Sequence, residues 1–361
     1  MGKLHRIRYT ILLLSGLCLA SPLFAAIDDT DTIARYSDLR SLAMGSAGIA
    51  LSEVNGSFHR NPAALFRREE PLFRIGARYG ELIVGSPEAN DPIPWIQRPA
   101  TAFEMLFSNR YVALSLGLGN VLDQEPLELN EANSKAFTAY NDSRIQMTAA
   151  YGWEHISVGL FARGGNRTQR DVVIREGSAV ADYITRTYLE RYDRKSSDGQ
   201  FFSSGVGLLL SYQWVSIGLL TNSLFNLDYE TNELILDGAD VFNGAAIGLA
   251  FTSPVFDRNN ELNRLVVNGV FDVTDLGDSD KRAVRFGLEG KVQFLSNLWA
   301  ALRTGYAEHR PAGQALFGLS GTGSLTFGAG GRIGNMGIDL GVEIPLDTEA
   351  VAISAGLTWG M

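Results

Sequence analysis

Residues 284–294 read VRFGLEGKVQF, and this run decides the fold because an apolar residue or glycine occupies every second position. The positions between them carry Arg285, Glu289 and Lys291, among others. A period of two predicts a β-strand with one apolar and one polar face. Runs 298–306, 325–333, 336–344 and 351–359 repeat the pattern. Each run has nine to eleven residues, the length of a tilted membrane-crossing strand, although a soluble β-sandwich alternates in the same way.

Strand candidates continue upstream of this stretch. Nine further segments show strand character: 73–82, 102–107, 111–119, 144–153, 156–164, 202–214, 215–224, 245–252 and 265–273. Together with the first five they make fourteen. Outside the N-terminus the chain has no apolar run of about 18 residues, which excludes a helical membrane protein.

The connections between these strands alternate between short and long, with two exceptions: 253–264 is long in a short position, and 345–350 is short in a long position. Turns such as 154–155 and 334–335 alternate with long connections such as 120–143 and 165–201. Bacterial outer-membrane barrels have an even strand number, tight periplasmic turns and longer outer loops, whereas a soluble sandwich has no reason to sort its loops. The sequence therefore predicts an all-β fold, a 14-stranded antiparallel transmembrane β-barrel over residues 73–361, in the cell outer membrane with both mature termini periplasmic.

Polar side chains in the opposite phase are predicted to line the barrel interior. The lumen-lining residues singled out are Arg285, Glu289, Arg303, Asp339 and Glu343. The same phase holds Arg74, Arg78, Glu104, Arg144, Gln146, Arg163, Asp272, Lys291 and Arg332. A charge turned to lipid at mid-bilayer costs about 2–4 kcal/mol. These side chains either contact a plug, neutralise one another, or simply pair across neighbouring strands.

The first 26 residues are predicted to be a secretory signal peptide. Lys3, Arg6 and Arg8 precede the apolar run 11–20, and small residues follow near Ala25. Removal of the three positive charges lowers the formal net charge from −9 to −12. An acidic mature chain argues against binding to nucleic acid.

Residues 27–72 lack strand periodicity but contain two patterned runs. The run 40–50 is rich in small residues, which lets the backbone pack closely. Asn61 and Pro62 suit the cap and first position of a helix. Two interpretations remain open, a compact plug inside the barrel or an N-terminal helix that only stabilises the wall.

The spacing of Arg40, Gly45 and the run Asn61-Pro62-Ala63 resembles the N-terminal hatch of the long-chain fatty acid transporter family (FadL) and its PorV-like relatives. The run 303–306, Arg-Thr-Gly-Tyr, resembles part of a late strand in these proteins. The resemblance implies a fourteen-stranded barrel plugged by the hatch, with hydrophobic substrates taken up through the outer loops. It also implies that Asn61, Pro62 and Ala63 belong to the element that shifts, and that Arg40 and Gly45 pack it. The chain departs from the usual barrel pattern in ending on Met361 rather than on an aromatic residue.

Candidate catalytic and metal-binding side chains are sparse. His59, His155 and His309 are far apart in sequence, and the only cysteine, Cys18, lies in the predicted signal peptide. Ser320 lacks the Gly-x-Ser-x-Gly spacing of a nucleophile elbow. We therefore predict no catalytic residue, no metal site and no cofactor.

Glycines are frequent, 39 in the chain, and in barrel strands glycine eases curvature or makes room for a ligand. Gly117 and Gly119 are candidates for a bulge in the third strand.

These observations predict an outer-membrane transport protein for the passive uptake of hydrophobic small molecules such as long-chain fatty acids, in contact with outer-membrane lipid. The connection 165–201, with its run Ala179-Val180-Ala181-Asp182-Tyr183-Ile184, is either a substrate-capturing loop or a loop that shields the barrel mouth. Two alternatives remain, a PorV-like barrel that binds or shuttles a protein partner, and a general porin.

Overall fold

The computed structural model describes most of the predicted barrel and two pieces of the preceding segment. The described residues are 38–51, 61–66, 72–84, 100–109, 111–127, 134–175, 192–227, 234–235, 241–242, 244–257, 264–277, 282–295, 297–308, 323–346 and 351–360. The predicted signal peptide, 1–26, and the run 179–184 lie outside these ranges.

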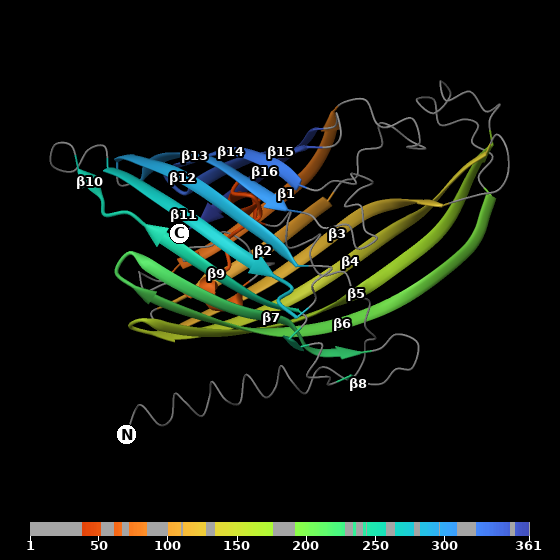
Figure 1. Ribbon diagram of the computed structural model, residues 1–361, viewed down its shortest axis with the longest axis horizontal. Coiled ribbons are helices and arrows are strands. Elements are labelled where there is room, and N and C mark those ends of the chain that lie inside the picture. The colour runs from red at the N-terminus through yellow and green to blue at the C-terminus, as the bar shows by residue number, and fades with distance from the viewer. Residues whose placement is uncertain are drawn as a thin grey trace.

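Fourteen strands form the wall of the molecule (Figure 1). They are β1 (Leu72–Val84), β2 (Ala100–Ser108), β3 (Val112–Leu127), β4 (Ser134–Trp153), β5 (Ile156–Arg175), β6 (Tyr192–Tyr212), β7 (Val215–Leu227), β9 (Ala245–Thr252), β11 (Arg264–Thr274), β12 (Ala283–Leu295), β13 (Leu298–Glu308), β14 (Gly323–Ile333), β15 (Met336–Pro345) and β16 (Val351–Gly360). The remaining elements are the two-residue strands β8 (Leu234–Ile235) and β10 (Phe256–Asp257), helix α3 (Leu39–Leu42) and the 3-10 helix η1 (Pro62–Leu65).

The sheet closes on itself, since each wall strand pairs antiparallel with a neighbour on both sides. Strand β16 pairs with β1, and β9 joins β7 to β11. The short strand β8 pairs with the end of β7, and β10 pairs with the end of β11. The predicted 14-stranded antiparallel barrel is therefore confirmed, and each predicted strand overlaps one observed strand.

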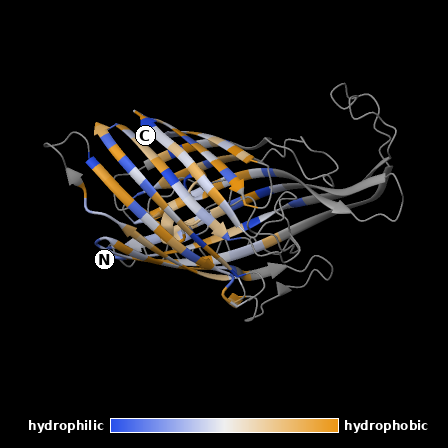
Figure 2. Ribbon diagram, turned by 45° about the horizontal axis from the view of Figure 1, so that its top comes forward, coloured by the Kyte–Doolittle hydropathy of each residue, from blue (hydrophilic) through white to orange (hydrophobic). Residues whose placement is uncertain are grey.

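The two faces of the wall differ as the period of two predicted. On β12 the inward Arg285 and Glu289 are 4% and 2% exposed, whereas the outward Phe286 and Leu288 are 50% and 55% exposed. Figure 2 shows the resulting alternation of hydrophilic and hydrophobic residues along the strands. Twelve of the fourteen predicted inward residues are buried, and Lys291 and Arg332 are half-buried. An apolar outer face around a polar interior is what a lipid-embedded barrel requires. No helix within the described ranges is long and apolar enough to span a membrane.

The short connections are tight turns. Glu154, Gln213 and Gly334 have φ angles of 32°, 50° and 60°, each at the start of a two-residue turn. The prediction that a strand runs to Trp214 is wrong, because Tyr212 pairs with Val215 and the two residues between them form the turn.

At the end of the barrel opposite these turns, strands β3 to β6 extend further than predicted and have 16, 20, 20 and 21 residues. Much of the connections predicted at 120–143 and 165–201 is thus strand, and the ladder between β4 and β5 reaches Ser134 and Arg175. These parts of the sequence carry polar residues in both phases, so they lack the alternation that marks a lipid-facing strand.

The predicted bulge at Gly117 and Gly119 is also wrong, because the ladders on both sides of β3 run through these residues without a shift. Gly117 instead pairs with Glu104 on β2 and with Gln146 on β4, and the side chains of both partners are buried. The ladder is irregular elsewhere, between β1 and β16 near Gly80 and between β6 and β7 near Ser204.

Candidate functional site

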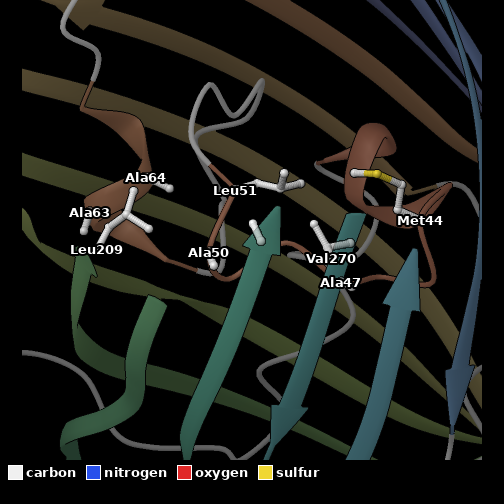
Figure 3. Packing of buried hydrophobic residues seen from close by; sticks show 9 residues of the cluster. Met44, Ala47, Ala50, Leu51, Ala63, Ala64, Leu209 and Val270 are labelled. Atoms are coloured by element: carbon white, nitrogen blue, oxygen red, sulfur yellow. The ribbon is translucent and has the colours of Figure 1, made fainter. Parts of the chain in front are cut away.

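Two pieces of chain that precede the first strand, residues 38–51 and 61–66, lie inside the barrel, and we call them together the inner segment. Every residue of both pieces is buried. In Figure 3, Met44 and Ala47 pack near Val270 of the wall, and Ala63 lies next to Leu209. The inner segment therefore fills part of the bore and contacts the wall from within.

A row of wall glycines accommodates the inner segment, and we call it the glycine belt. It consists of Gly356 (β16), Gly341 (β15), Gly328 (β14), Gly305 (β13), Gly287 (β12), Gly248 (β9), Gly218 (β7), Gly207 (β6), Gly159 (β5) and Gly152 (β4). A Cβ at any of these positions would lie 2.0 to 3.2 Å from an atom of the inner segment. Most of these separations are too short for carbon, so glycine permits a close approach that other residues would block.

The inner segment contacts the wall in the reverse of strand order. Leu39 lies against β16, Met44 against β12 and β13, and Ile49 against β7 and β9. Pro62 lies against β5, and Phe66 against β4. The two pieces together therefore follow most of the inner circumference.

Arg40 of helix α3 binds the wall through a buried charge network. Its Nε and Nη2 donate to the two carboxylate oxygens of Glu289 at 3.0 and 2.6 Å. Arg303 donates from Nε to Glu289 at 2.7 Å and from Nη1 to Asp339 at 2.6 Å. Asn268 adds a hydrogen bond to Glu289 at 2.8 Å.

The four charged side chains of this network balance, two positive against two negative. Those of Glu289 and Arg303 are each 1% exposed. Removal of one member of such a buried group leaves an uncompensated charge, at a cost of about 3–5 kcal/mol. The network thus ties helix α3 to β12, β13 and β15 and makes the contact sensitive to any single substitution.

Backbone amides of the first piece are held by two further wall side chains. The Oδ2 of Asp272, on β11, accepts from the amides of Gly48 and Ile49 at 2.6 and 3.0 Å. The Oγ1 of Thr326 accepts from the amide of Gly45 at 2.7 Å. Gly45 has a φ of 71°, and a Cβ there would lie 2.2 Å from a wall carbonyl oxygen. Glycine is therefore required at position 45 by both conformation and space.

The second piece is held by neutral groups around Asn61. Its Oδ1 accepts from the amide of Ala63 at 3.0 Å and so caps η1, as predicted. Its Nδ2 donates to the carbonyl oxygens of Ile49 and Leu208 at 2.7 and 3.2 Å, which joins the two pieces to each other and to β6. Ser157 on β5 donates to the carbonyl oxygen of Ala63 at 2.9 Å.

The structure brings most of the predicted site residues together. Arg40, Gly45, Asn61, Pro62 and Ala63 are all buried and lie against the wall. The predicted lumen residues divide into two groups.

Glu289, Arg303 and Asp339 form one network with Arg40. Glu343 instead accepts a hydrogen bond at 2.6 Å from Ser324 on the neighbouring strand, and Arg285 is buried on the same wall.

Sequence reasoning missed the partners that hold the inner segment through single hydrogen bonds, Ser157 and Thr326, and the role of Asp272. It also missed the glycine belt. The belt has a signal that could have revealed it, namely glycine in the inward phase of many different strands.

The inward face of the wall also carries polar pairs outside the Arg40 network. Arg78 pairs with Glu104 at 2.8 Å, and Arg163 donates to Ser203 at 2.5 Å. Among the described residues, no three His, Cys, Asp or Glu side chains are grouped so that they could hold a metal ion.

No protein-family model and no curated protein matches this sequence. Among solved structures, it is similar to the toluene transporter TbuX of Ralstonia pickettii, with 14% identity, a TM-score of 0.51, and 91% of this chain and 98% of that chain covered. It is similar to the CymD monoaromatic hydrocarbon channel, with 13% identity, a TM-score of 0.55, and 91% and 98% covered. It is also similar to the toluene transporter TodX of Pseudomonas putida, with 12% identity, a TM-score of 0.54, and 89% and 96% covered. The chain therefore has the fold of the FadL-type transporter barrels, and the resemblance inferred from residues 40–66 is confirmed at the level of the fold.

Proposed function

We propose that this protein is an outer-membrane transporter through which hydrophobic small molecules, such as long-chain fatty acids, enter the cell by passive diffusion. The inner segment is the hatch of this transporter, and both ends of the mature chain are periplasmic. The observation that carries the proposal is a buried inner segment held across the bore of a barrel whose outer face is apolar.

The structural relatives support the kind of substrate. These relatives are two transporters of toluene and a channel for monoaromatic hydrocarbons. At these identities the likeness concerns the fold. Fatty acid and toluene are the two substrates to compare first.

We expect the piece around Asn61 to be the part of the hatch that yields. Asn61, Pro62 and Ala63 are held by neutral hydrogen bonds and apolar contacts, whereas Arg40 belongs to a buried charge network. A hydrogen bond between neutral groups contributes about 1 kcal/mol, much less than the loss of one buried charge partner. Gly45 and Arg40 then hold the rest of the hatch in place.

Uptake into lipid vesicles tests the proposal. Vesicles carrying the purified protein are compared with empty vesicles and with vesicles carrying Asn61→Ala, using labelled oleate and labelled toluene. We expect uptake of at least one solute above the empty vesicles, and faster uptake with Asn61→Ala because the hatch is held less firmly. Equal rates in all three preparations for both solutes would contradict import.

One observation favours a second candidate, a general porin. The described inner wall carries charged pairs such as Arg78 with Glu104, and a polar lumen is typical of porins. A porin would conduct ions in planar bilayers without any change in the inner segment, whereas a hatch-closed transporter would conduct little until the hatch is released.

A further inference from the structure

We infer that the inner segment has a second role, separate from the control of transport. It holds the barrel closed, so that the wall reaches its full stability only when the inner segment is bound around its inside. The inference goes beyond the proposed function, because it concerns the folding of the wall rather than the passage of a solute.

The first reason is how far the contacts extend around the wall. The glycine belt places one close contact on each of ten strands, and Asp272 adds an eleventh strand through its bonds to Gly48 and Ile49. A plug that merely blocks the bore needs contacts on a few strands only. A segment that touches consecutive strands in order constrains the spacing of those strands, because its own covalent length fixes the distance between successive contacts.

The second reason is where Leu39 packs. Gly356 of β16 pairs with Arg78 of β1 across the seam at which the barrel closes. A Cβ at Gly356 would lie 2.8 Å from Leu39 and 3.2 Å from the Arg78 side chain. Leu39 therefore packs at the joint between the first and the last strand, and the chain continues from there along β15, β14 and β13.

The third reason is the set of contacts that the wall would lose without the inner segment. Glu289 would lose both hydrogen bonds from Arg40, and Asp272 would lose two amide donors. Buried carboxylates deprived of their partners destabilise the structure that surrounds them. The glycine belt would also lose its packing partner on ten strands, together with the dispersion contacts made there.

Glycine substitutions provide the test, with a control on the same strand. A Cβ at Gly287 would lie 2.4 Å from Met44, and a Cβ at Gly305 would lie 2.2 Å from Gly45, whereas a Cβ at Gly290 would meet nothing within 4 Å. Gly287→Ala and Gly305→Ala therefore push the inner segment away without removing a wall hydrogen bond. Gly290→Ala makes the same chemical change where no inner segment lies.

The readout is the temperature at which the folded barrel, reconstituted in lipid, loses its compact band in sodium dodecyl sulfate gels. We expect Gly287→Ala and Gly305→Ala to lower this midpoint by about 1–4 °C, since overpacking of a filled interior is destabilising. The midpoint of Gly290→Ala should equal that of the unmodified protein. Equal midpoints for all four proteins would overturn the inference.

A second variant covers the case in which the glycine substitutions prevent folding. Met44→Ala leaves every wall strand unchanged and trims a fully buried side chain of the inner segment. We expect it to lower the same midpoint, and an unchanged midpoint would overturn the inference. None of these measurements involves a transported solute, so a failure of the transport proposal and a failure of this one are distinguishable.

Discussion

The two pieces of the inner segment are held by different kinds of interaction, and the difference indicates which part of the hatch can move. We call residues 38–51 the charged arc and residues 61–66 the neutral arc. The charged arc is fixed by the Arg40–Glu289 ion pair and by the carboxylate of Asp272. The neutral arc is held by Asn61, Ser157 and apolar packing. Strong fixation at one side and weak fixation at the other suits a hatch that opens locally while the rest stays bound.

The largest expected effect is the loss of the central carboxylate of the charged arc. Glu289→Ala leaves Arg40 and Arg303 buried without their shared partner, so we expect a loss of about 3–5 kcal/mol in unfolding free energy. Urea titration of the reconstituted protein measures it. Arg264→Ala removes an exposed charge from β11 and serves as the control, with no measurable change expected. A loss no larger than that of the control would show that the charged arc is not fixed by its charges.

A smaller effect is expected at the junction of the two arcs. Asn61→Ala removes the cap of η1 and the side-chain bonds to Ile49 and Leu208, and buried groups left without a hydrogen-bond partner cost about 1–3 kcal/mol. The same urea titration gives the value. A loss larger than that of Glu289→Ala would show that the neutral arc is held more strongly than the charged arc. Asn61 would then not belong to the more easily released half.

The smallest effect is expected at a single hydrogen bond of the neutral arc. Ser157→Ala leaves the carbonyl oxygen of Ala63 without its donor, with an expected loss of about 1 kcal/mol. Protease cleavage of the inner segment in the reconstituted protein is a sensitive measure, because it detects local release without unfolding of the barrel. Faster cleavage than in the unmodified protein is expected, and unchanged cleavage would mean that this bond does not contribute to holding the neutral arc.

The wall could be predicted from the sequence wherever lipid imposes one apolar face, as in residues 284–294, which form β12 almost without change. The prediction failed at residues 134–143 of β4 and 165–175 of β5, because polar residues occur there in both phases.

The site could be predicted in part. The run Asn61-Pro62-Ala63 predicts a helix cap that depends only on local geometry, and Asn61 caps η1 in the structure. The partners of the inner segment could not be predicted, because Arg40 and Glu289 are 249 residues apart and only the closed barrel brings them together. The same holds for Gly48 and Asp272.

Amide hydrogen exchange of the membrane-embedded protein, with and without added oleate, tests the central claim most directly. The claim is that a hydrophobic solute passes a hatch that yields at the neutral arc. We predict that oleate speeds exchange at the amides of Ala63, Ala64 and Phe66, and that the amides of Gly45 and Gly48 stay protected by Thr326 and Asp272. Equal acceleration in both arcs, or no response in either, would contradict it.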